Sequence, residues 1–574
     1  MGERSAYRVK KFFIFFIHNR IKIFKHMKRI FKPFFITAGL IIALAISCVN
    51  TGTEVLKESD YRRAEKMLSS HTSGLVYGAD VRPRWTDDNH FWYMNSIRGG
   101  HEFILVDAES MERSPAFDHE RLSILLSAEL EEEYEASKLP FRSLSFSPDL
   151  SAVSFTAEGN RYTYDKDNDV LNKSDDGEYV IENSVASPDG SKAAFIRDYN
   201  LWVKDTDSGR ETQLTFDGIK DFGYATNNAG WTRRETPVLL WSPDSRMIAT
   251  FKHDGRGVGQ MYLATTNVGH PEPEIWKYPL PGDSLIFRIH RVVIHVDRQE
   301  TVKLKMDPDP HRSTITDHIA TRGGKFADVE WSPDGSMLAF VSTSRNHQHE
   351  VLRLADPFTG EVRDVYEESS DTFFESGYNM INWHILPETN EFIWYSQRSN
   401  WGHLYLYDLA TGELKNAITS GDWKVLQLLH IDKENRKLYF TAAGREPGDP
   451  YFQYLYSIKT DGSDLKLHTP DSANHNVNIN PGGSYFVDSY STPVDPPVTV
   501  LRSTGTDDMM ELETADISEL LAEGWVAPVP FTVKARDQKT DLYGLMHKPS
   551  DFEQSKKYTV INHIYCGAQS GRVG

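Results

Sequence analysis

The sequence has 574 residues, of which 39% are hydrophobic and 12% aromatic, and its formal net charge is −19. This composition excludes a disordered chain and a collagen-like chain. Residues 1–34 carry ten Lys or Arg against one acidic residue, so the rest of the chain holds a net charge of −28. An acidic body of this size repels phosphate backbones, which argues against nucleic acid as a partner. Only two cysteines occur, Cys48 and Cys566, so a disulfide scaffold and a cysteine-rich zinc site are excluded, and we expect no metal and no cofactor.

The basic start leads into an apolar run of about 14 residues that ends at Cys48. This run is too short to favour a membrane span, and its order of basic, apolar and small residues is typical of an export signal. Residues 44–48, Leu-Ala-Ile-Ser-Cys, look like a bacterial lipoprotein box. We therefore expect residues 1–48 to be a signal, with the true start at Met27 and a lipid on Cys48. The mature protein would then be held at the membrane in the bacterial periplasm or cell envelope; an uncleaved signal anchor is the alternative.

Internal repeats predict the architecture. Four segments share a Ser-Pro-Asp turn followed by alternating apolar residues, at 146–155, 186–195, 241–250 and 331–340. Ser, Pro and Asp suit successive positions of a type I turn, and the alternation predicts a strand after each turn. Degenerate copies follow at 386–394, 431–439 and 480–486.

The spacing of these turns predicts an all-β fold. The repeats recur every 40 to 55 residues except for one gap of 90, which we expect to contain a divergent unit around 285–295. An opening unit at 85–107 precedes them. Short strands with this period predict a β-propeller of roughly eight blades. An array of all-β sandwiches is the structural alternative, but it explains the fixed order of turn and strand less well.

The character of the sequence changes after the last repeat. Asp516 and Glu519 form a capping-box pattern that predicts a short helix ending at Gly524. Segments 531–535 and 542–547 then predict a hairpin, and 558–565 predicts a buried strand. We therefore expect residues 516–574 to begin a second domain that the sequence does not complete.

These features together resemble the dipeptidyl peptidase IV branch of the prolyl oligopeptidase-like serine peptidases. The resemblance rests on the Ser-Pro-Asp propeller, the helical segment 60–68, the segment 223–232 and the Tyr-Cys-Gly sequence at 565–567. It implies an eight-bladed propeller over residues 55–515, followed by an α/β-hydrolase domain with a Ser-Asp-His triad. Residues 516–574 would be the linker helix and first strands of that hydrolase domain, and the triad would lie beyond the end of this sequence.

The sequence itself lacks the catalytic motif of such a domain. A hydrolase nucleophile sits in G-x-S-x-G, and no such pentapeptide occurs. The nearest matches, around Ser484 and Ser284, lack the last glycine and are better explained as turns. Residues 255–259 indicate a hairpin and not a phosphate loop, and His347 and His349 have no third ligand, so no metal site is predicted. We therefore expect the chain as given to be inactive as a peptidase.

Two residues are candidates for roles at the implied active site. By resemblance, Tyr565 would donate its hydroxyl to the oxyanion hole; a tyrosine that merely ends a strand is the alternative. The family's paired glutamates, which hold the substrate's amino terminus, have no counterpart in residues 229–235, where Glu235 is the one carboxylate. Arg233 and Arg234 weaken the attraction of that segment for an ammonium group.

These features are consistent with two functions. The first is an exported serine peptidase acting on peptides, with a possible homodimer formed through the missing catalytic domain. The second is a propeller lipoprotein without enzymatic activity that binds a protein or a glycan. The tail favours the peptidase, because a self-contained binding propeller has no use for a hairpin and a strand that cannot form a sheet alone.

Overall fold

The computed structural model describes residues 56–173, 183–226, 235–311, 319–321, 324–374 and 382–564. The chain divides into two compact units, residues 1–71 and 72–574. The helix α3 (Glu58–Glu65) begins two residues before the predicted helical segment 60–68 and ends within it, and α4 (Ser69–Thr72) follows. Among the helices of the described residues, none is long and apolar enough to span a membrane.

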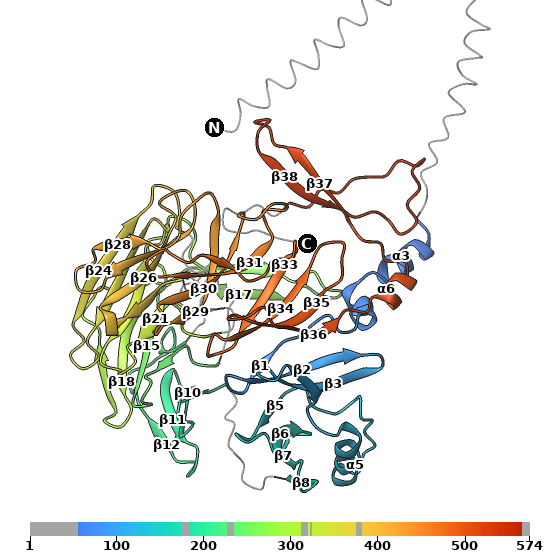
Figure 1. The fold of residues 1–574 in the computed structure, drawn as a ribbon. Coiled ribbons are helices and arrows are strands. Elements are labelled where there is room, and N and C mark those ends of the chain that lie inside the picture. Colours follow the sequence, from blue (N-terminus) through green and yellow to red (C-terminus); the bar gives the residue numbers. More distant parts are fainter. Residues whose placement is uncertain are drawn as a thin grey trace, which may run out of the picture. The chain divides into compact units, whose positions relative to one another are not determined.

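The described part of the second unit forms eight large antiparallel sheets, seven of four strands and one of six, and two separate two-stranded hairpins. They follow one another along the chain in Figure 1, from the blue blade 1 to the orange blade 8. Blade 1 contains β1 (Arg84–Trp85), β2 (His90–Ile97), β3 (Gly100–Asp107) and β4 (Glu112–Pro115), and blade 2 contains β5 (Leu144–Phe146), β6 (Ala152–Ala157), β7 (Asn160–Asp165) and β8 (Val170–Lys173). Blade 3 contains β9 (Val185–Ala186), β10 (Lys192–Arg197), β11 (Asn200–Asp205) and β12 (Glu211–Gln213). Blade 4 contains β13 (Phe222–Tyr224), β14 (Leu240–Trp241), β15 (Met247–Asp254), β18 (Arg288–His295), β19 (Glu300–Lys303) and β20 (Asp309–Pro310).

The second half of the ring repeats the four-stranded pattern. Blade 5 contains β21 (Val329–Trp331), β22 (Leu338–Thr343), β23 (His349–Ala355) and β24 (Val362–Ser369), and blade 6 contains β25 (His384–Leu386), β26 (Glu391–Ser396), β27 (His403–Asp408) and β28 (Leu414–Ala417). Blade 7 contains β29 (Lys424–Asp432), β30 (Lys437–Ala443), β31 (Gln453–Lys459) and β32 (Lys466–Leu467), and blade 8 contains β33 (Asn474–Ile479), β34 (Tyr485–Ser491), β35 (Val498–Ser503) and β36 (Met509–Thr514). The remaining short elements are η1 (Ser73–Leu75), α5 (His119–Leu130) between blades 1 and 2, and η2 (Pro387–Thr389).

This arrangement confirms the predicted eight-bladed β-propeller and corrects one part of the prediction. The 90-residue gap does not contain a separate unit, because β18 pairs along its whole length with β15 in the sheet of blade 4. The gap instead holds an inserted hairpin, β16 (Gln260–Ala264) and β17 (Pro273–Lys277), between those two strands. Residues 255–259, predicted as a hairpin, form the connection from β15 into this insertion.

Consecutive blades are joined through the first strand of each sheet, which we call its A strand, followed by B, C and D. The indole of Trp241 in blade 4 donates to the carbonyl of Val185 in blade 3 at 3.1 Å, and the Trp331 indole of blade 5 donates to Leu240 O at 3.2 Å. The ring closes in the same way, since the Trp85 indole of blade 1 donates to Asn478 Oδ1 of blade 8. The A strands bond to one another at these three junctions, as expected of the strands that line the centre of a propeller.

Apolar clusters fill seven of the eight seams between neighbouring blades. Blades 4 and 5 share one around Phe251 and Phe340, and blades 8 and 1 share one around Leu501 and Phe91. Similar clusters join blades 1 and 2, 3 and 4, 5 and 6, 6 and 7, and 7 and 8. Among the described residues, no such cluster joins blades 2 and 3; residues 174–182 between them lie outside the description.

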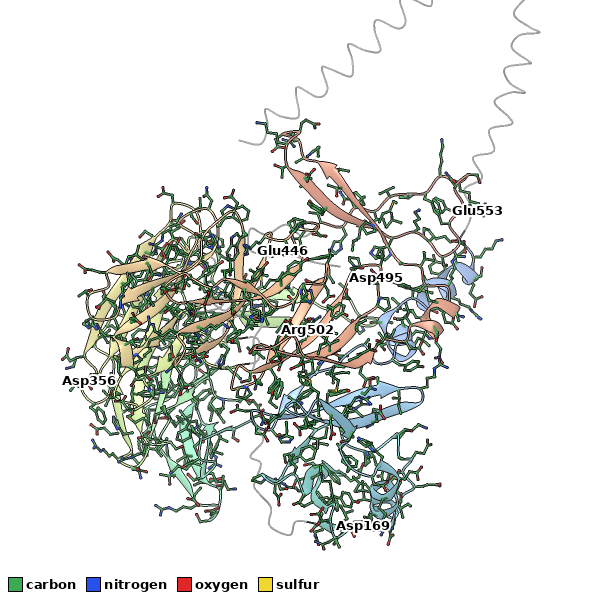
Figure 2. All side chains as sticks on the ribbon, in the orientation of Figure 1. Asp169, Asp356, Glu446, Asp495, Arg502 and Glu553 are labelled. Carbon is green, nitrogen blue, oxygen red and sulfur yellow. The ribbon has the colours of Figure 1, made fainter. Side chains whose placement is uncertain are left out.

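The strand order gives the propeller two distinct faces. The turn face carries the Ser-Pro-Asp turns between A and B strands and the turns between C and D strands, such as those of Asp169 and Asp356. The loop face carries the connections between B and C strands, such as those of Glu446 and Asp495, and the links from one blade to the next (Figure 2). The inserted hairpin β16–β17 also arises from the loop face, since it connects a B strand to a C strand.

The chain after blade 8 partly matches the prediction. The helix α6 (Ser518–Ala522) follows Asp516, whose Oδ1 accepts from the Ser518 amide at 2.8 Å, and β37 (Val529–Lys534) pairs with β38 (Asp541–Met546) as the predicted hairpin (Figure 1). The predicted buried strand is not found. Residues 558–564 form no strand, and Val560 and Ile561 are 87% and 89% exposed. The described chain offers these residues no neighbouring strand, and a strand needs hydrogen bonds from a partner.

Candidate functional site on blade 4

The A strand of blade 4 is interrupted and consists of two short strands, β13 and β14. β13 pairs with the end of β15 nearest the loop face, and β14 pairs with its other half. Between them the chain leaves the strand after Ala225 and rejoins it at Val238, whose amide donates to Ala225 O at 2.9 Å. We call residues 226–237 the blade 4 excursion and the Ala225–Val238 bond its neck. Residues 227–234 of the excursion lie outside the description.

Backbone strain marks the neck. Ala225 has a left-handed φ of 54° and is completely buried. A non-glycine residue in this region is uncommon and is kept only where the surrounding structure fixes it. Here the Ala225 amide donates to Phe251 O, and its carbonyl accepts from Val238, so both of its backbone groups are committed. The chain is therefore held in a sharp change of direction at the point where the excursion begins.

Glu235 lies on the returning limb of the excursion, and its residue is exposed. Its Oε2 accepts from Asn183 Nδ2 at 3.2 Å, and the neighbouring Thr236 hydroxyl donates to Asn183 Oδ1 at 3.4 Å. Asn183 lies two residues before the A strand of blade 3, so this limb is attached to the preceding blade. A carboxylate has about four acceptor positions, and this contact uses one. The arrangement can therefore still accept hydrogen bonds from an ammonium or guanidinium group.

A buried cation stands beside the strand that leads into the neck. Lys252 of β15 donates from Nζ to both the carbonyl and the Oδ2 of Asp217, each at 2.8 Å, and the Tyr224 hydroxyl donates to Asp217 Oδ1 at 2.7 Å. Partial burial would raise the pKa of Asp217, but the hydrogen bonds from Lys252 and Tyr224 outweigh it and hold that pKa below its usual value. Asp217 therefore stays ionised and binds both residues.

Two buried histidines lie at the same end of blade 4. The rings of His253 and His311 meet edge to face with centroids 4.8 Å apart, and His253 also stacks on Phe287. Burial lowers the pKa of His253 well below its usual value, with the neighbouring His311 as a second cause. Among the described residues, no group of three or more His, Cys, Asp or Glu is placed to hold a metal ion. The pair is therefore part of the packing at the loop face.

Of the predicted site residues Glu235, Tyr565 and Cys48, the structure describes one. Glu235 is described and lies on the excursion, whereas Tyr565 and Cys48 lie outside the described residues. Ser484 belongs to the A–B turn of blade 8, and Ser284 to the connection between β17 and β18, as predicted. His347 stacks on Phe373, while His349 begins β23 and faces Glu367 at 3.4 Å, so the two imidazoles do not share a ligand position.

Sequence reasoning missed Lys252, Asp217 and the neck. The unusual segment at 223–232 was the one local sign of the excursion. The partners of the neck and of Lys252 are up to 35 residues apart in sequence, and no local pattern connects them. An apolar-looking B strand that contains a lysine, Ile-Ala-Thr-Phe-Lys at 248–252, is the signal that could have identified a buried charge.

Comparisons with known proteins agree with this architecture. Residues 142–497 match the family model described as the dipeptidyl peptidase IV (DPP IV) N-terminal region. A protein of Neosartorya fischeri named "Probable dipeptidyl-aminopeptidase B" is 22% identical over 429 residues, covering 68% of this chain and 44% of that protein. A protein of Aspergillus fumigatus named "Probable dipeptidyl peptidase 4" is 23% identical over 406 residues, covering 67% of this chain and 50% of that protein. The chain thus spans about half the length of the curated relatives it matches.

A solved structure shows the same fold. The crystal structure of Porphyromonas gingivalis dipeptidyl peptidase 4 superposes with a TM-score of 0.61 at 19% sequence identity, covering 86% of this chain and 68% of that one. The propeller found in the described residues is thus a fold already known from that structure. Because the family model matches more than half of its residues, the chain belongs to the dipeptidyl peptidase IV N-terminal region family.

Proposed function

We propose that this chain is the propeller region of an exported serine peptidase of the dipeptidyl peptidase IV kind, whose catalytic Ser, Asp and His lie beyond Gly574. In this proposal the propeller selects peptides and presents them to the catalytic domain, and Glu235 binds the amino terminus of the substrate. The chain as given is inactive, because a serine hydroxyl needs an adjacent base to become a nucleophile and no G-x-S-x-G serine is present.

The blade 4 excursion is the observation that carries the proposal. It starts from a strained and fully bonded neck, and its described returning residues include an exposed carboxylate. An exposed carboxylate can bind the ammonium group of a peptide by a charge-assisted hydrogen bond. Segments held in strained backbone conformations are concentrated at functional sites.

Two further observations support it. Blade 8 ends on the loop face, so the chain after it leaves the propeller on the side of the B–C connections. The hairpin β37–β38 then presents an apolar face: Val529 pairs with Met546, Phe531 with Gly544 and Val533 with Leu542, and the five side chains are between 39% and 50% exposed. An exposed apolar sheet face of this kind is typical of a surface that another element covers.

The experiment compares substrates that differ only at the amino terminus. In the full-length enzyme, we expect a chromogenic dipeptide anilide with a free amino group to be hydrolysed with a lower KM than its N-acetylated form. Replacing Glu235→Gln should raise KM for the free peptide about tenfold, or about 1.4 kcal/mol, while kcat changes little. KM for the acetylated peptide should stay the same, because its amide carries no charge.

Glu434→Gln is the matched control, because Glu434 is an exposed glutamate in the A–B turn of blade 7, on the turn face. We expect it to leave both substrates unaffected. Absence of hydrolysis by the full-length enzyme would overturn the peptidase proposal and favour the binding lipoprotein. If the enzyme hydrolyses peptides but KM changes equally in the two glutamate variants, Glu235 does not bind the substrate, and the peptidase proposal still holds.

A further inference from the structure

Three cations surround the short strand β13. The ring of Phe222 lies 4.0 Å from Lys252 Nζ and 3.9 Å from Arg256 Cζ, measured to its centroid. Lys277 is the third cation, with its Nζ 2.9 Å from Asp221 Oδ2, directly before the strand. The face of an aromatic ring attracts cations, and the attraction grows when the cation is desolvated. β13 is thus held by charged side chains as well as by its pairing with β15.

Each of these cations is fixed by its own aspartate. Arg256 binds Asp254 through two hydrogen bonds of 2.9 and 2.7 Å, and Lys252 binds Asp217. Lys252 is the most buried of the three, with 5% of its surface exposed. A lysine is almost never buried to this extent without a partner, since removing an ammonium group from water is costly. Its retention at this position therefore calls for a role that an apolar residue of similar size would not fill.

The residues around the end of β13 indicate that role. The strand has only three residues, and its last residue, Tyr224, bonds to Asp217, which Lys252 also holds. The next residue is the strained Ala225 of the neck. A three-residue strand that leads directly into a strained turn gains little stability from its own backbone hydrogen bonds. The side-chain bonds of Lys252 to Asp217, and through it to Tyr224, supply the missing attachment.

We propose that Lys252 is a positioning residue, which holds β13 and the neck in place and thereby fixes the position of Glu235, three residues before Val238. Arg256 and Lys277 assist at the start of the strand, through Phe222 and Asp221. Lys252 itself need not touch a substrate. The catalytic part of this inference rests on the proposed function; the structural part can be tested on the present chain alone.

The structural test measures hydrogen exchange at the neck. In Lys252→Met, a change of similar volume that leaves the largely exposed Asp217 side chain in water, we expect the amides of Ala225 and Val238 to exchange at least tenfold faster. Tyr224→Phe keeps the ring and loses only the hydroxyl bond to Asp217, so we expect a smaller acceleration at the same two amides.

Lys415→Met is the matched control. It removes a lysine from its carboxylate partner Glu391 in blade 6, and Arg436 remains bound to Glu391 at 2.8 Å. We expect exchange at Ala225 and Val238 to be unchanged in this variant. Equal acceleration at the neck in both lysine variants, or none in Lys252→Met, would overturn the inference.

The kinetic test separates this inference from the proposed function. In the full-length enzyme, we expect Lys252→Met to raise KM for the peptide with a free amino group and to leave kcat, and both constants for the acetylated peptide, within twofold of wild type. If the enzyme hydrolyses no peptide, the proposed function fails and the exchange result stands by itself. If kcat falls for both substrates alike, Lys252 acts on general stability and the positioning role is wrong.

Discussion

The tryptophans of the Trp-Ser-Pro-Asp turns do more than mark a turn. In each turn the Ser hydroxyl donates to the Asp carboxylate, as Ser332 does to Asp334 at 2.7 Å, and this local arrangement follows from residue preferences that a sequence displays. The indole bonds of Trp241 and Trp331 reach carbonyls 56 and 91 residues earlier in the chain. The turns could therefore be predicted, whereas the bonds that join the blades could not.

The residue after the Asp in these turns is also only partly explained by local residue preferences. Gly190 and Gly335 occupy this position with φ near 70°, and Leu150 and Ser245 occupy it with φ near 60°. Glycine in two of the four turns is explained by the left-handed conformation that the turn requires. Leucine and serine are tolerated there because the Ser and Asp hydrogen bonds hold the turn, a compensation that no single position reveals.

The buried side chain of His468 should make the stability of the protein depend on pH. It is buried beside Tyr439 and Phe486, and its Nε2 lies 2.8 Å from Ser457 Oγ. Burial, with Lys466 and Lys437 adding repulsion, lowers its pKa to about 4. The unfolded chain, with a histidine pKa near 6.5, binds a proton at higher pH than the folded protein does. Stability is therefore complete above about pH 6.5 and falls as the pH drops from there toward 4.

As the pH falls from 7.5 to 4.5, we expect the titration of His468 to lower the free energy of unfolding by about 2.5 kcal/mol. His468→Phe removes this titration, so urea unfolding of the variant should depend less on pH than unfolding of the wild type. Other histidines with lowered pKa contribute equally to both proteins and cancel in the comparison: His101, His119, His253, His290, His403 and His430. Parallel pH curves for the two proteins would contradict the assignment.

Among the elements, blade 4 is the one whose structure the repeat pattern did not predict in full. A divergent unit was expected around 285–295, and the strand β18 forms there. Assigning it to a new blade was wrong because spacing alone does not distinguish a missing unit from an insertion. The inserted hairpin β16–β17 and the excursion together lengthen this blade, and both depend on contacts outside the repeat. Glu235 could be identified from its position before Trp241, but its attachment to Asn183 could not.

The hairpin β37–β38 was predicted in position, and its geometry yields a test. The face formed by Val529, Phe531, Val533, Leu542 and Met546 is apolar and partly exposed, with Phe531 covering Gly544. We expect this chain to bind the hydrophobic dye ANS there. The double variant Val533→Thr, Leu542→Thr should lower the dye fluorescence, because threonine keeps the strand propensity and removes apolar surface from a paired position.

Thr532→Ser provides the control, since Thr532 pairs with Tyr543 on the opposite face of the same hairpin. Its effect on dye binding should be negligible. If the double variant binds as much dye as the wild type, the apolar face of the hairpin is not the dye site. Exposed apolar residues elsewhere, such as Phe216 and Ile219, would then be the sites to examine.

For the whole molecule, the seam between blades 2 and 3 differs from the other seven. On β6 the buried Val153, Phe155 and Ala157 turn toward blade 1, while Ser154 on the other face bonds to Thr163 of β7 at 2.9 Å. On blade 3, Phe195 and Trp202 are covered by Arg197 of the same blade. Its Cζ lies 5.1 Å from the centroid of the Phe195 ring and 4.9 Å from that of the Trp202 ring. Among the residues that the structure describes, the two facing surfaces therefore share no apolar cluster; residues 174–182, which join the two blades, lie outside the description.

This asymmetry predicts where the ring opens first. Buried apolar contacts supply most of the free energy that holds neighbouring sheets together, so a seam whose described residues form no apolar cluster should open at the lowest cost. We expect native-state hydrogen exchange in increasing denaturant to reach β7 and β11, on either side of this seam, before β27 and β30. The latter strands flank the seam of blades 6 and 7, which buries fifteen apolar residues in one cluster. The seam between blades 1 and 2 is the internal control, because it also involves blade 2 but contains an apolar cluster, to which β6 contributes. If the amides of β7 and β11 exchange at the same denaturant concentration as those of β27 and β30, the ring unfolds as one unit. The seam between blades 2 and 3 is then as strong as the others.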